Sequence, residues 1–210
     1  MNIKASYNKW SSQYDTNLNK TRDLEGNILK GFLKTYTAKS ILEIGCGTGK
    51  NTAWFLENFE EVTSVDFSEE MLTIAKNKIQ AAHVTFIEAD INLPWAFLKS
   101  QYDLVSFSLV LEHIEDLENI FNKTSNALKD GGYVYIGELH PFKQYSGSKA
   151  RFETESGTET LTCFTHHISE FIRAAEKHGL QLIKIEEHFD EDDKNGLPRI
   201  LTLMFQKIKS

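Results

Sequence analysis

The sequence predicts an α/β protein with a doubly wound, mostly parallel sheet of seven strands and helices on both faces. Short apolar stretches alternate along the chain with stretches of helical pattern, which is typical of right-handed βαβ units. A glycine-rich turn directly follows the first apolar stretch. The last two apolar stretches have no helical pattern between them, which predicts a closing hairpin with one antiparallel strand near the C-terminus.

Each predicted element rests on a local pattern. The strand-like stretches are residues 41–44, 62–66, 84–87, 102–107, 180–186 and 200–206, and residues 128–136 supply a turn and a further strand. Helical patterns lie at 51–59, from Ser68 onward, and from about Thr165 to His178. Ser68 is a suitable N-cap because acidic residues follow it in the first turn, and Gly179 is a stop signal for the last of these helices.

Length, charge and cysteine content limit the class of protein. A chain of 210 residues is long enough for one domain with a full α/β core. Two cysteines give no disulfide framework, the first residues lack a signal-peptide pattern, and no stretch approaches the roughly 18 apolar residues that cross a membrane. The net charge of −7 disfavours a nucleic-acid partner. We expect a cytoplasmic monomer or homodimer with no membrane partner, no nucleic-acid partner and no metal site.

The glycine-rich turn is the most informative segment. Gly45, Gly47 and Gly49 follow the strand-like stretch 41–44 at every second position. Glycines there let the backbone adopt positive φ and approach a ligand closely. The free N–H groups of the helix that follows can face an anion or a polar group. The turn therefore predicts a nucleotide-like cofactor at the end of the first strand.

Two familiar nucleotide motifs do not fit this turn. A dinucleotide site requires G-x-G-x-x-G, but the residue three after Gly47 is Lys50. A triphosphate site requires G-x-x-x-x-G-K-[ST], but the preceding glycine is at 45 rather than 44, and Asn51 replaces the hydroxyl residue.

The pattern E-x-G-x-G-x-G at 43–49 instead resembles the first motif of class I S-adenosylmethionine-dependent methyltransferases. The segments 62–66, 84–91, 102–114 and 128–136 follow in the order of that family's further motifs, so the similarity runs from about residue 38 to 138. The resemblance implies that the cofactor is S-adenosyl-L-methionine. It also implies that Asp90 accepts the exocyclic amine of the adenine, with the Ile91 backbone at the ring edge.

The spacing of Asp66 from the glycine-rich turn predicts that Asp66 also binds the cofactor. Asp66 lies 21 residues after Gly45, which suits hydrogen bonds to ribose hydroxyls, although Asp66 could instead be a turn residue. Glu43 needs a polar partner inside its apolar strand, and it either orients the turn or approaches the cofactor's amino group. The predicted cofactor-binding residues are Tyr14, Arg22, Glu43, Gly45, Cys46, Gly47, Gly49, Asp66, Phe67, Asp90, Ile91, Ser106 and Phe107.

An N-terminal helix with three aromatic rings on one face precedes the core. Tyr7, Trp10 and Tyr14 recur at spacings of three and four, which fits either core packing or a lid. The resemblance to small-molecule methyltransferases implies a lid, with Tyr14 at the methionine end of the cofactor. Arg22 would then meet the methionine carboxylate or an acidic substrate.

A segment of about 24 residues, 141–164, is expected to be a functional loop on the substrate side, since loops of this length are rare in compact domains. His140 is held extended before Pro141 and is the candidate general base, because an unperturbed histidine pKa near 6.5 suits proton transfer at neutral pH. The alternative is a structural histidine. The candidate substrate-side residues are Tyr7, Trp10, His113, Glu138, Tyr145 and Arg151.

These observations predict one domain, 1–210, with four parts. They are an N-terminal helical lid at 1–37, a cofactor-binding core at 38–138, a substrate-side insertion at 139–164, and a C-terminal helix and strand hairpin at 165–210. The expected activity is methyl transfer to an oxygen or nitrogen atom of a small molecule by in-line displacement. The alternatives are a protein methyltransferase and a non-catalytic S-adenosylmethionine-binding protein.

Overall fold

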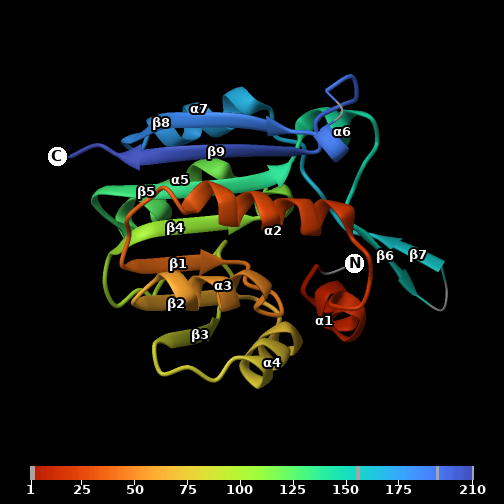
Figure 1. Ribbon diagram of the computed structural model, residues 1–210, viewed down its shortest axis with the longest axis horizontal. Coiled ribbons are helices and arrows are strands. Elements are labelled where there is room, and N and C mark those ends of the chain that lie inside the picture. Colours follow the sequence, from red (N-terminus) through yellow and green to blue (C-terminus); the bar gives the residue numbers. More distant parts are fainter. Residues whose placement is uncertain (1–2, 155–156, 193, 210) are drawn as a thin grey trace.

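The computed structural model describes residues 3–154, 157–192 and 194–209, and its centre is a seven-stranded sheet in the order β3-β2-β1-β4-β5-β9-β8 (Figure 1). The strands are β1 (Ser40–Ile44), β2 (Glu61–Asp66), β3 (Val84–Glu88), β4 (Tyr102–Ser108), β5 (Leu128–Leu139), β8 (Leu180–His188) and β9 (Ile200–Lys207). Strands β1 to β5 are mutually parallel, and β9 is antiparallel to both of its neighbours. The predicted fold class is confirmed.

Helices cover both faces of the sheet. They are α1 (Ile3–Tyr14), α2 (Lys20–Leu33), α3 (Lys50–Asn58), α4 (Glu69–Lys78), α5 (Leu117–Ala127), α6 (Pro141–Tyr145) and α7 (Ile168–Glu176), with short 3₁₀ turns η1 (Leu111–His113) and η2 (Asp190–Asp192). Helices α2 and α3 pack on one face, and α5 and α7 on the other (Figure 1).

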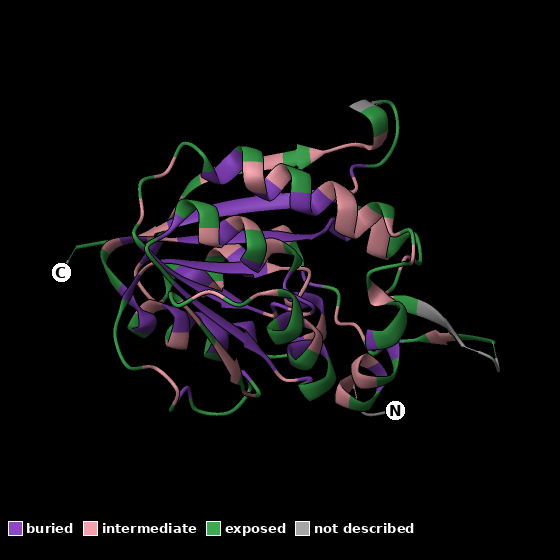
Figure 2. Ribbon diagram, turned by 60° about the horizontal axis from the view of Figure 1, so that its bottom comes forward, coloured by how far each residue is buried: buried purple, intermediate pink, exposed green. Residues whose placement is uncertain are grey.

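The central strands are buried on both sides because successive side chains point to opposite faces. Ile41 of β1 and Leu104 of β4 belong to the core beneath α2 and α3, whereas Leu42 and Val105, one residue further along, belong to the core beneath α5 and α7. Figure 2 shows these strands buried and the outer faces of the helices exposed. The continuous apolar runs of the sequence therefore correspond to a sheet between two helical layers.

The start of α4 agrees with its predicted cap. The Ser68 hydroxyl accepts a hydrogen bond from the Met71 backbone N–H at 3.2 Å, and Glu69 and Glu70 lie in the first turn. Acidic residues are favourable there because the N-terminus of a helix carries a partial positive charge.

The prediction of a long loop without regular structure after β5 is wrong. Residues 141–164 contain α6 and a two-stranded hairpin of β6 (Arg151–Thr154) and β7 (Gly157–Thr160). Pro141 occupies the first position of α6, where its fixed φ favours a helix and its missing N–H costs nothing, and His140 is the N-cap. These elements are too short to leave a periodic pattern in the sequence.

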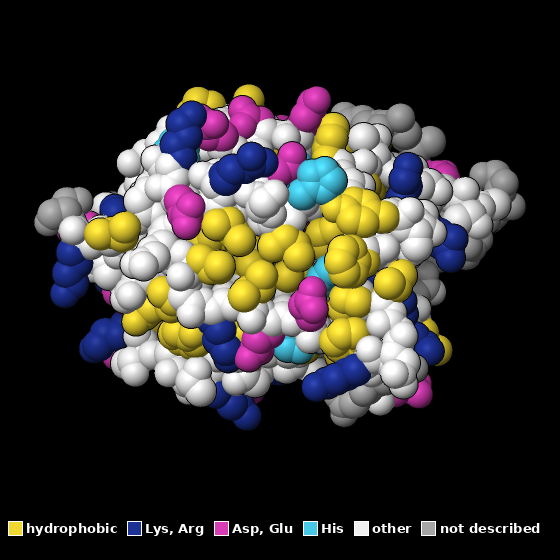
Figure 3. All heavy atoms as spheres, turned by 90° about the horizontal axis from the view of Figure 1, so that it is seen from above, with side chains coloured by type: hydrophobic (Ala, Val, Ile, Leu, Met, Phe, Trp, Pro, Cys, Tyr) yellow, Lys and Arg dark blue, Asp and Glu magenta, His cyan; other side chains and the backbone are white. Residues whose placement is uncertain are grey.

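Strand β8 forms one edge of the sheet and carries exposed apolar side chains. Ile183 and Ile185 are each 43% exposed, and Figure 3, which looks onto this side of the molecule, shows hydrophobic side chains gathered among charged ones. Lys184 and Glu186 form an ion pair at 2.9 Å on the same strand. No helix in the described part of the chain is long and apolar enough to cross a membrane.

Candidate functional site

Two neighbouring cavities lie beneath α1, and we call the first of them the inner cavity. It has a volume of about 590 Å³ and lies at the carboxyl ends of β1, β2, β3 and β4. Ligands bind in this position in open parallel sheets. Its walls include Tyr7, Tyr14, Gly45, Gly47, Asp66, Phe67, Asp90, Ile91, Ser108, Leu109 and His113. The volume is in the range of small-molecule and cofactor sites.

The glycine turn needs its glycines for packing as well as for conformation. Gly45, with φ of 74°, lies so close to Val110 that a Cβ would overlap that side chain. At Gly49, with φ of 83°, a Cβ would approach Ile79 Cδ1 to 2.8 Å and Ala75 Cβ to 3.3 Å. Gly49 therefore lets α3 begin against the side of α4, and Gly45 lets the segment after β4 close one wall of the cavity.

Replacing Gly49 by alanine should destabilise the fold by about 2 kcal/mol, from the left-handed backbone and the contact with α4. The measurement is the free energy of unfolding in urea. Gly31→Ala is the matched control, because a Cβ there meets nothing within 4 Å and alanine favours the α2 helix. A Gly49→Ala protein as stable as the Gly31→Ala protein would contradict the steric account.

Asp66 ties the glycine turn to α4. Its Oδ2 accepts the Gly47 N–H at 2.8 Å and its Oδ1 accepts the Ser68 N–H at 2.9 Å. The side chain is 7% exposed at the cavity wall, and burial raises the pKa of its carboxyl from the usual value although the backbone N–H groups oppose this. Each oxygen keeps a further lone pair for a ligand hydroxyl.

Asp90 and Ile91 follow β3 and also line the inner cavity. Asp90 Oδ1 accepts the backbone and side-chain N–H groups of Asn92 at 2.9 and 3.0 Å, which fixes the carboxylate. Ile91 is 8% exposed and provides an apolar wall beside it. A fixed carboxylate next to an apolar surface can bind a ring that carries an amine.

Glu43 has its partners inside the protein. Its Oε2 accepts the hydroxyls of Thr52 at 2.5 Å and Ser64 at 2.7 Å, which joins β1, α3 and β2. It is absent from the walls of the inner cavity, and burial raises its pKa to about 7. Of the two roles considered for Glu43, these contacts favour orientation of the turn.

Glu43 should make stability depend on pH. Its pKa is about 7 in the folded state and near 4.5 in the unfolded state, so the folded protein binds the extra proton between these values. Its contribution to the free energy of unfolding is therefore largest below pH 4.5 and falls by up to about 3 kcal/mol as pH rises through 7. Urea unfolding between pH 5 and 8 should show a flatter profile for Glu43→Gln than for the parent; identical slopes would contradict the assignment.

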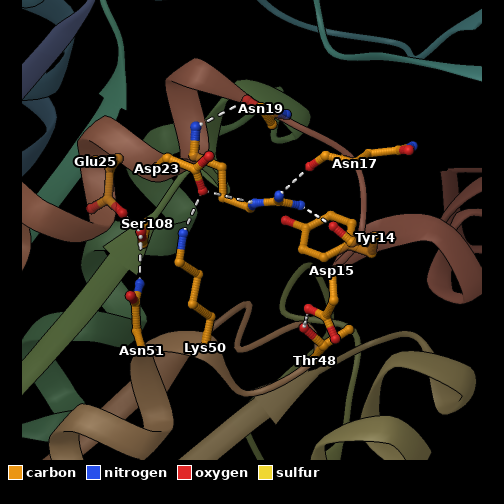
Figure 4. Close-up of polar contacts among 11 residues, drawn as sticks. Tyr14, Asp15, Asn17, Asn19, Asp23, Glu25, Thr48, Lys50, Asn51 and Ser108 are labelled. Carbon is orange, nitrogen blue, oxygen red and sulfur yellow. Dashed lines mark hydrogen bonds and ion pairs between the residues drawn. The ribbon is translucent and has the colours of Figure 1, made fainter.

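Helix α1 forms a roof over the inner cavity and is attached at several points. Asn8 accepts a hydrogen bond from Ser68 at 2.6 Å, Lys4 pairs with Glu88 at 2.6 Å, and Asp15 accepts the Thr48 hydroxyl at 2.6 Å. Figure 4 shows the contact between Asp15 and Thr48. It also shows the ion pair between Asp23 and Lys50, which joins α2 to the start of α3. The N-terminal segment is thus held against the glycine turn and α4.

Arg22 organises the connection between α1 and α2. Its guanidinium donates to the backbone oxygens of Tyr14 and, at 2.7 Å, of Asn17, and it lies 4.8 Å from the centre of the Tyr14 ring. This places the Tyr14 ring at the cavities, while Nη1 and Nη2 of Arg22 are engaged by these two backbone oxygens. Arg22 itself lies on the second cavity rather than the first.

Tyr7 and His113 form a hydrogen-bonded pair in the wall of the inner cavity. Tyr7 Oη lies 2.9 Å from His113 Nε2, and His113 Nδ1 lies 2.9 Å from the Thr162 backbone oxygen. A carbonyl oxygen can only accept, so Nδ1 carries a proton; in the neutral ring Nε2 then accepts from the Tyr7 hydroxyl. Burial raises the pKa of Tyr7 well above its usual value, so the phenol stays protonated.

The outer cavity, the second hollow, has a volume of about 610 Å³ and adjoins the inner one, since Tyr7, Tyr14 and Leu109 line both. Its other walls come from α1, the start of α2, η1 and the segment around β6. They include Trp10, Lys20, Arg22, Glu112, Leu139, Ser148, Lys149, Arg151 and Arg199. Two ligands could therefore meet beneath α1.

His140 lies away from both cavities. Its side chain is fully buried, Nε2 contacts Glu187 at 3.0 Å, and Nδ1 accepts the Phe142 N–H at 3.2 Å. Burial lowers the pKa of His140 although Glu187 opposes this. These contacts favour the structural alternative, in which His140 caps α6, over the role of general base.

Other predicted residues also lie outside the cavity walls. Ser106 and Phe107 are buried within β4, and the next residue, Ser108, reaches the cavity instead. Glu138 is buried with its Oε1 on the N–H groups of Val110 and Leu111, and Tyr145 is half exposed against His167. Cys46 and Gly49 belong to the turn but not to the cavity walls.

Comparison with known proteins indicates the class of protein to which the chain is similar. Residues 42–136 match a family model described as a methyltransferase domain. A ubiquinone biosynthesis O-methyltransferase of Hydrogenovibrio crunogenus is 28% identical over 76% of this chain and 66% of its own length. A malonyl-[acyl-carrier protein] O-methyltransferase of Buchnera aphidicola is 30% identical over 70% and 58%, so the chain spans two thirds or less of these relatives. The structure of the N-methyltransferase NodS from Bradyrhizobium japonicum with S-adenosyl-L-homocysteine superimposes with a TM-score of 0.72 at 16% identity, covering 99% of both chains.

The chain contains a methyltransferase domain at residues 42–136 and has the fold of S-adenosylmethionine-dependent methyltransferases. The NodS structure holds S-adenosyl-L-homocysteine, the demethylated form of the cofactor that the motif order predicts. The residues of the inner cavity fit this cofactor, because two glycines without side chains and an anchored carboxylate stand at its wall. Within the described residues of the methyltransferase, no three His, Cys, Asp or Glu side chains are grouped to hold a metal ion.

Leu109 is the residue of this methyltransferase that sequence reasoning missed most clearly. It has a φ of 56° although it is not a glycine, and its N–H donates to the Gly137 oxygen at 2.8 Å. Positive φ is rare for a bulky residue and is often found at functional sites. Leu109 lines both cavities of the methyltransferase, but leucine carries no sequence signal for this conformation.

Proposed function

We propose that this protein transfers the methyl group of S-adenosyl-L-methionine to an oxygen or nitrogen atom of a small molecule held in the outer cavity. The supporting observation is that two cavities of about 590 and 610 Å³ meet at Tyr7, Tyr14 and Leu109. The sulfonium of the cofactor supplies an activated methyl group, so the protein has mainly to align donor and acceptor. An acceptor cavity covered by α1 favours a small molecule over a protein substrate, which needs an open trough.

The inner cavity would hold the cofactor in one orientation. Asp66 would accept the ribose hydroxyls, and Asp90 the adenine amine beside Ile91. The methionine part would lie over Gly45 and Gly47, beneath the ring of Tyr14. This orientation directs the sulfonium towards Tyr14 and Leu109, where the two cavities meet.

Tyr7 and His113 are better placed than His140 to take a proton from the acceptor. An acceptor O–H or N–H that donates to Tyr7 Oη would lose its proton to that oxygen while the Tyr7 proton moves to His113 Nε2, 2.9 Å away. In the imidazolium that forms, the Nδ1 proton remains hydrogen-bonded to the Thr162 oxygen. Histidine is the side chain that most often serves as general base in enzymes.

Calorimetric titration with S-adenosylmethionine and S-adenosylhomocysteine, with NADH and ATP as controls, tests the cofactor site. Micromolar binding of the sulfur nucleotides alone is expected. Formation of S-adenosylhomocysteine with a panel of small alcohols, phenols and amines then tests the acceptor class. Methylation of added protein and of no small molecule would overturn the proposal; binding without transfer to either class would identify a cofactor-binding protein.

A further inference from the structure

Charge is distributed unevenly around the outer cavity. Its inner wall is aromatic and apolar, with Trp10, Leu109 and Leu139 among its residues. The charged residues that line it are Glu112 and five cations, Lys20, Arg22, Lys149, Arg151 and Arg199. The whole chain has a net charge of −7, so this excess of cations is local to the cavity.

Three of the five cations are available to a ligand. Arg199 is occupied by Asp190 and Thr21, and Arg22 by backbone oxygens of the α1–α2 connection. Among residues in the described ranges, none forms a hydrogen bond or ion pair with the side chains of Lys20, Lys149 or Arg151, and all three are exposed. Unpaired cations at the mouth of a low-dielectric cavity attract anions and hold them by charge-assisted hydrogen bonds.

Glu112 is the opposite case, a carboxylate that is buried without a full set of partners. It lines the outer cavity from η1, is 7% exposed, and its Oε2 has no hydrogen-bond partner in the part of the chain that the structure describes. A buried acceptor without a partner costs about 1–3 kcal/mol, more when charged. A ligand with an O–H or N–H group at this point would satisfy it.

We propose that the acceptor is an anionic molecule whose carboxylate or phosphate binds Lys149 and Arg151 at the rim, and that an O–H or N–H group other than the one that is methylated donates to Glu112 at the inner wall. Lys20, at the start of α2, adds to the positive potential around the outer cavity. The part of the acceptor between the two ends is apolar or aromatic, to match Trp10 and Leu139. This inference rests on the proposed function, since it names the class of substrate for the same site.

Matched pairs of probes test the anionic end. Protein saturated with S-adenosylhomocysteine is titrated calorimetrically with 4-hydroxybenzoate, 4-aminobenzoate and 3-hydroxypropanoate, with the primary amide of each, and with 4-hydroxyphenyl phosphate. The anions should bind at least about tenfold more tightly than the amides, and the preference should shrink at high salt. Tighter binding of the phosphate than of the carboxylates identifies a phosphorylated acceptor, and the reverse a carboxylic acid. Equal affinities for anions and amides, or no binding of either, would overturn the proposal.

Charge-reversed variants then locate the effect. Lys149→Glu with Arg151→Glu should abolish the preference for anions and leave the affinity for S-adenosylhomocysteine unchanged. Lys34→Glu with Lys99→Glu is the matched control, since both lysines are exposed and lie outside both cavities but change the net charge equally. Equal losses in the two double variants would mean a general charge effect and would overturn the site. Failure of S-adenosylhomocysteine to bind would instead sink the proposed function.

Glu112→Gln tests the inner end with 4-hydroxybenzoate and benzoate. The parent should bind the hydroxylated probe several-fold more tightly, and Glu112→Gln should lose most of that difference while keeping the affinity for benzoate. An unchanged difference would remove Glu112 from the proposal. A parallel loss for both probes would identify a structural role for Glu112 and would overturn the inner contact as well.

Discussion

Tyr7→Phe is expected to lower kcat for methyl transfer by about 10²- to 10⁴-fold, the usual size of a lost general acid–base contribution, and to leave cofactor affinity nearly unchanged. The substitution keeps the ring, which contacts Trp10 and Phe67, but removes the hydroxyl that contacts His113. Without the hydroxyl, His113 Nε2 has no route to the acceptor proton. The measurement is S-adenosylhomocysteine formation at saturating cofactor and acceptor, with calorimetry for the affinity.

Tyr36→Phe is the matched control for this change. Tyr36 packs on Tyr133 and Phe32 at the far end of α2 and lines neither cavity. Its loss of a hydroxyl should leave kcat within twofold. If Tyr7→Phe retains full turnover, the proton does not pass through Tyr7; if it lowers cofactor affinity as much as kcat, Tyr7 acts through the shape of the lid. If the acceptor atom reacts without losing a proton, Tyr7→Phe should lower kcat no more than Tyr36→Phe does.

Asp66→Ala is expected to weaken S-adenosylmethionine binding by about 1.5–3 kcal/mol, roughly 10- to 150-fold in Kd, the usual range for hydrogen bonds to a charged group. Two causes contribute. The ribose loses its acceptor, and the Gly47 and Ser68 N–H groups lose the oxygens that hold the turn in place. Calorimetry measures the affinity, and thermal unfolding without cofactor measures the change in stability.

Asp103→Ala separates the two causes. Asp103 also accepts backbone N–H groups, from Lys39 and Ser40 at 3.0 and 2.9 Å, but at the opposite end of the sheet from the glycine turn. Its variant should lose stability and keep the parent affinity for the cofactor. If Asp66→Ala kept that affinity as well, Asp66 would be a residue of the turn alone and the ribose would lie elsewhere.

Much of the fold was predictable because local sequence patterns, such as apolar runs and helix caps, mark its strands and helices. The central strands β1 and β4 are buried on both faces, so their residues are mostly apolar, and helix α4 carries its own N-cap. The glycine turn and Asp66 could be placed for the same reason, since both lie at strand ends that the pattern locates. The hairpin of β6 and β7 escaped prediction because its strands are only four residues each.

The candidate site was predictable only where position along a strand decides it. Ser106, Phe107 and Ser108 are consecutive, and which of them reaches the cavity depends on where β4 ends, which no local pattern shows. His140 looked like a base because it follows β5, but packing turned its ring towards Glu187. His113 was a candidate from the sequence, but its pairing with Tyr7 and Thr162 depends on contacts between distant segments, and so does the position of Glu112 at the outer cavity.

The raised pKa values of the buried carboxyls also raise the isoelectric point of the folded protein. Burial raises the pKa of Glu25 and Glu43 to about 7 and that of Glu138 to about 8, so all three are largely neutral near the sequence-derived isoelectric point of about 5.5. The formal charge counts each of them as ionised. Native protein should therefore focus at a higher pH than the same chain in urea, and it should release up to three protons on unfolding near pH 6.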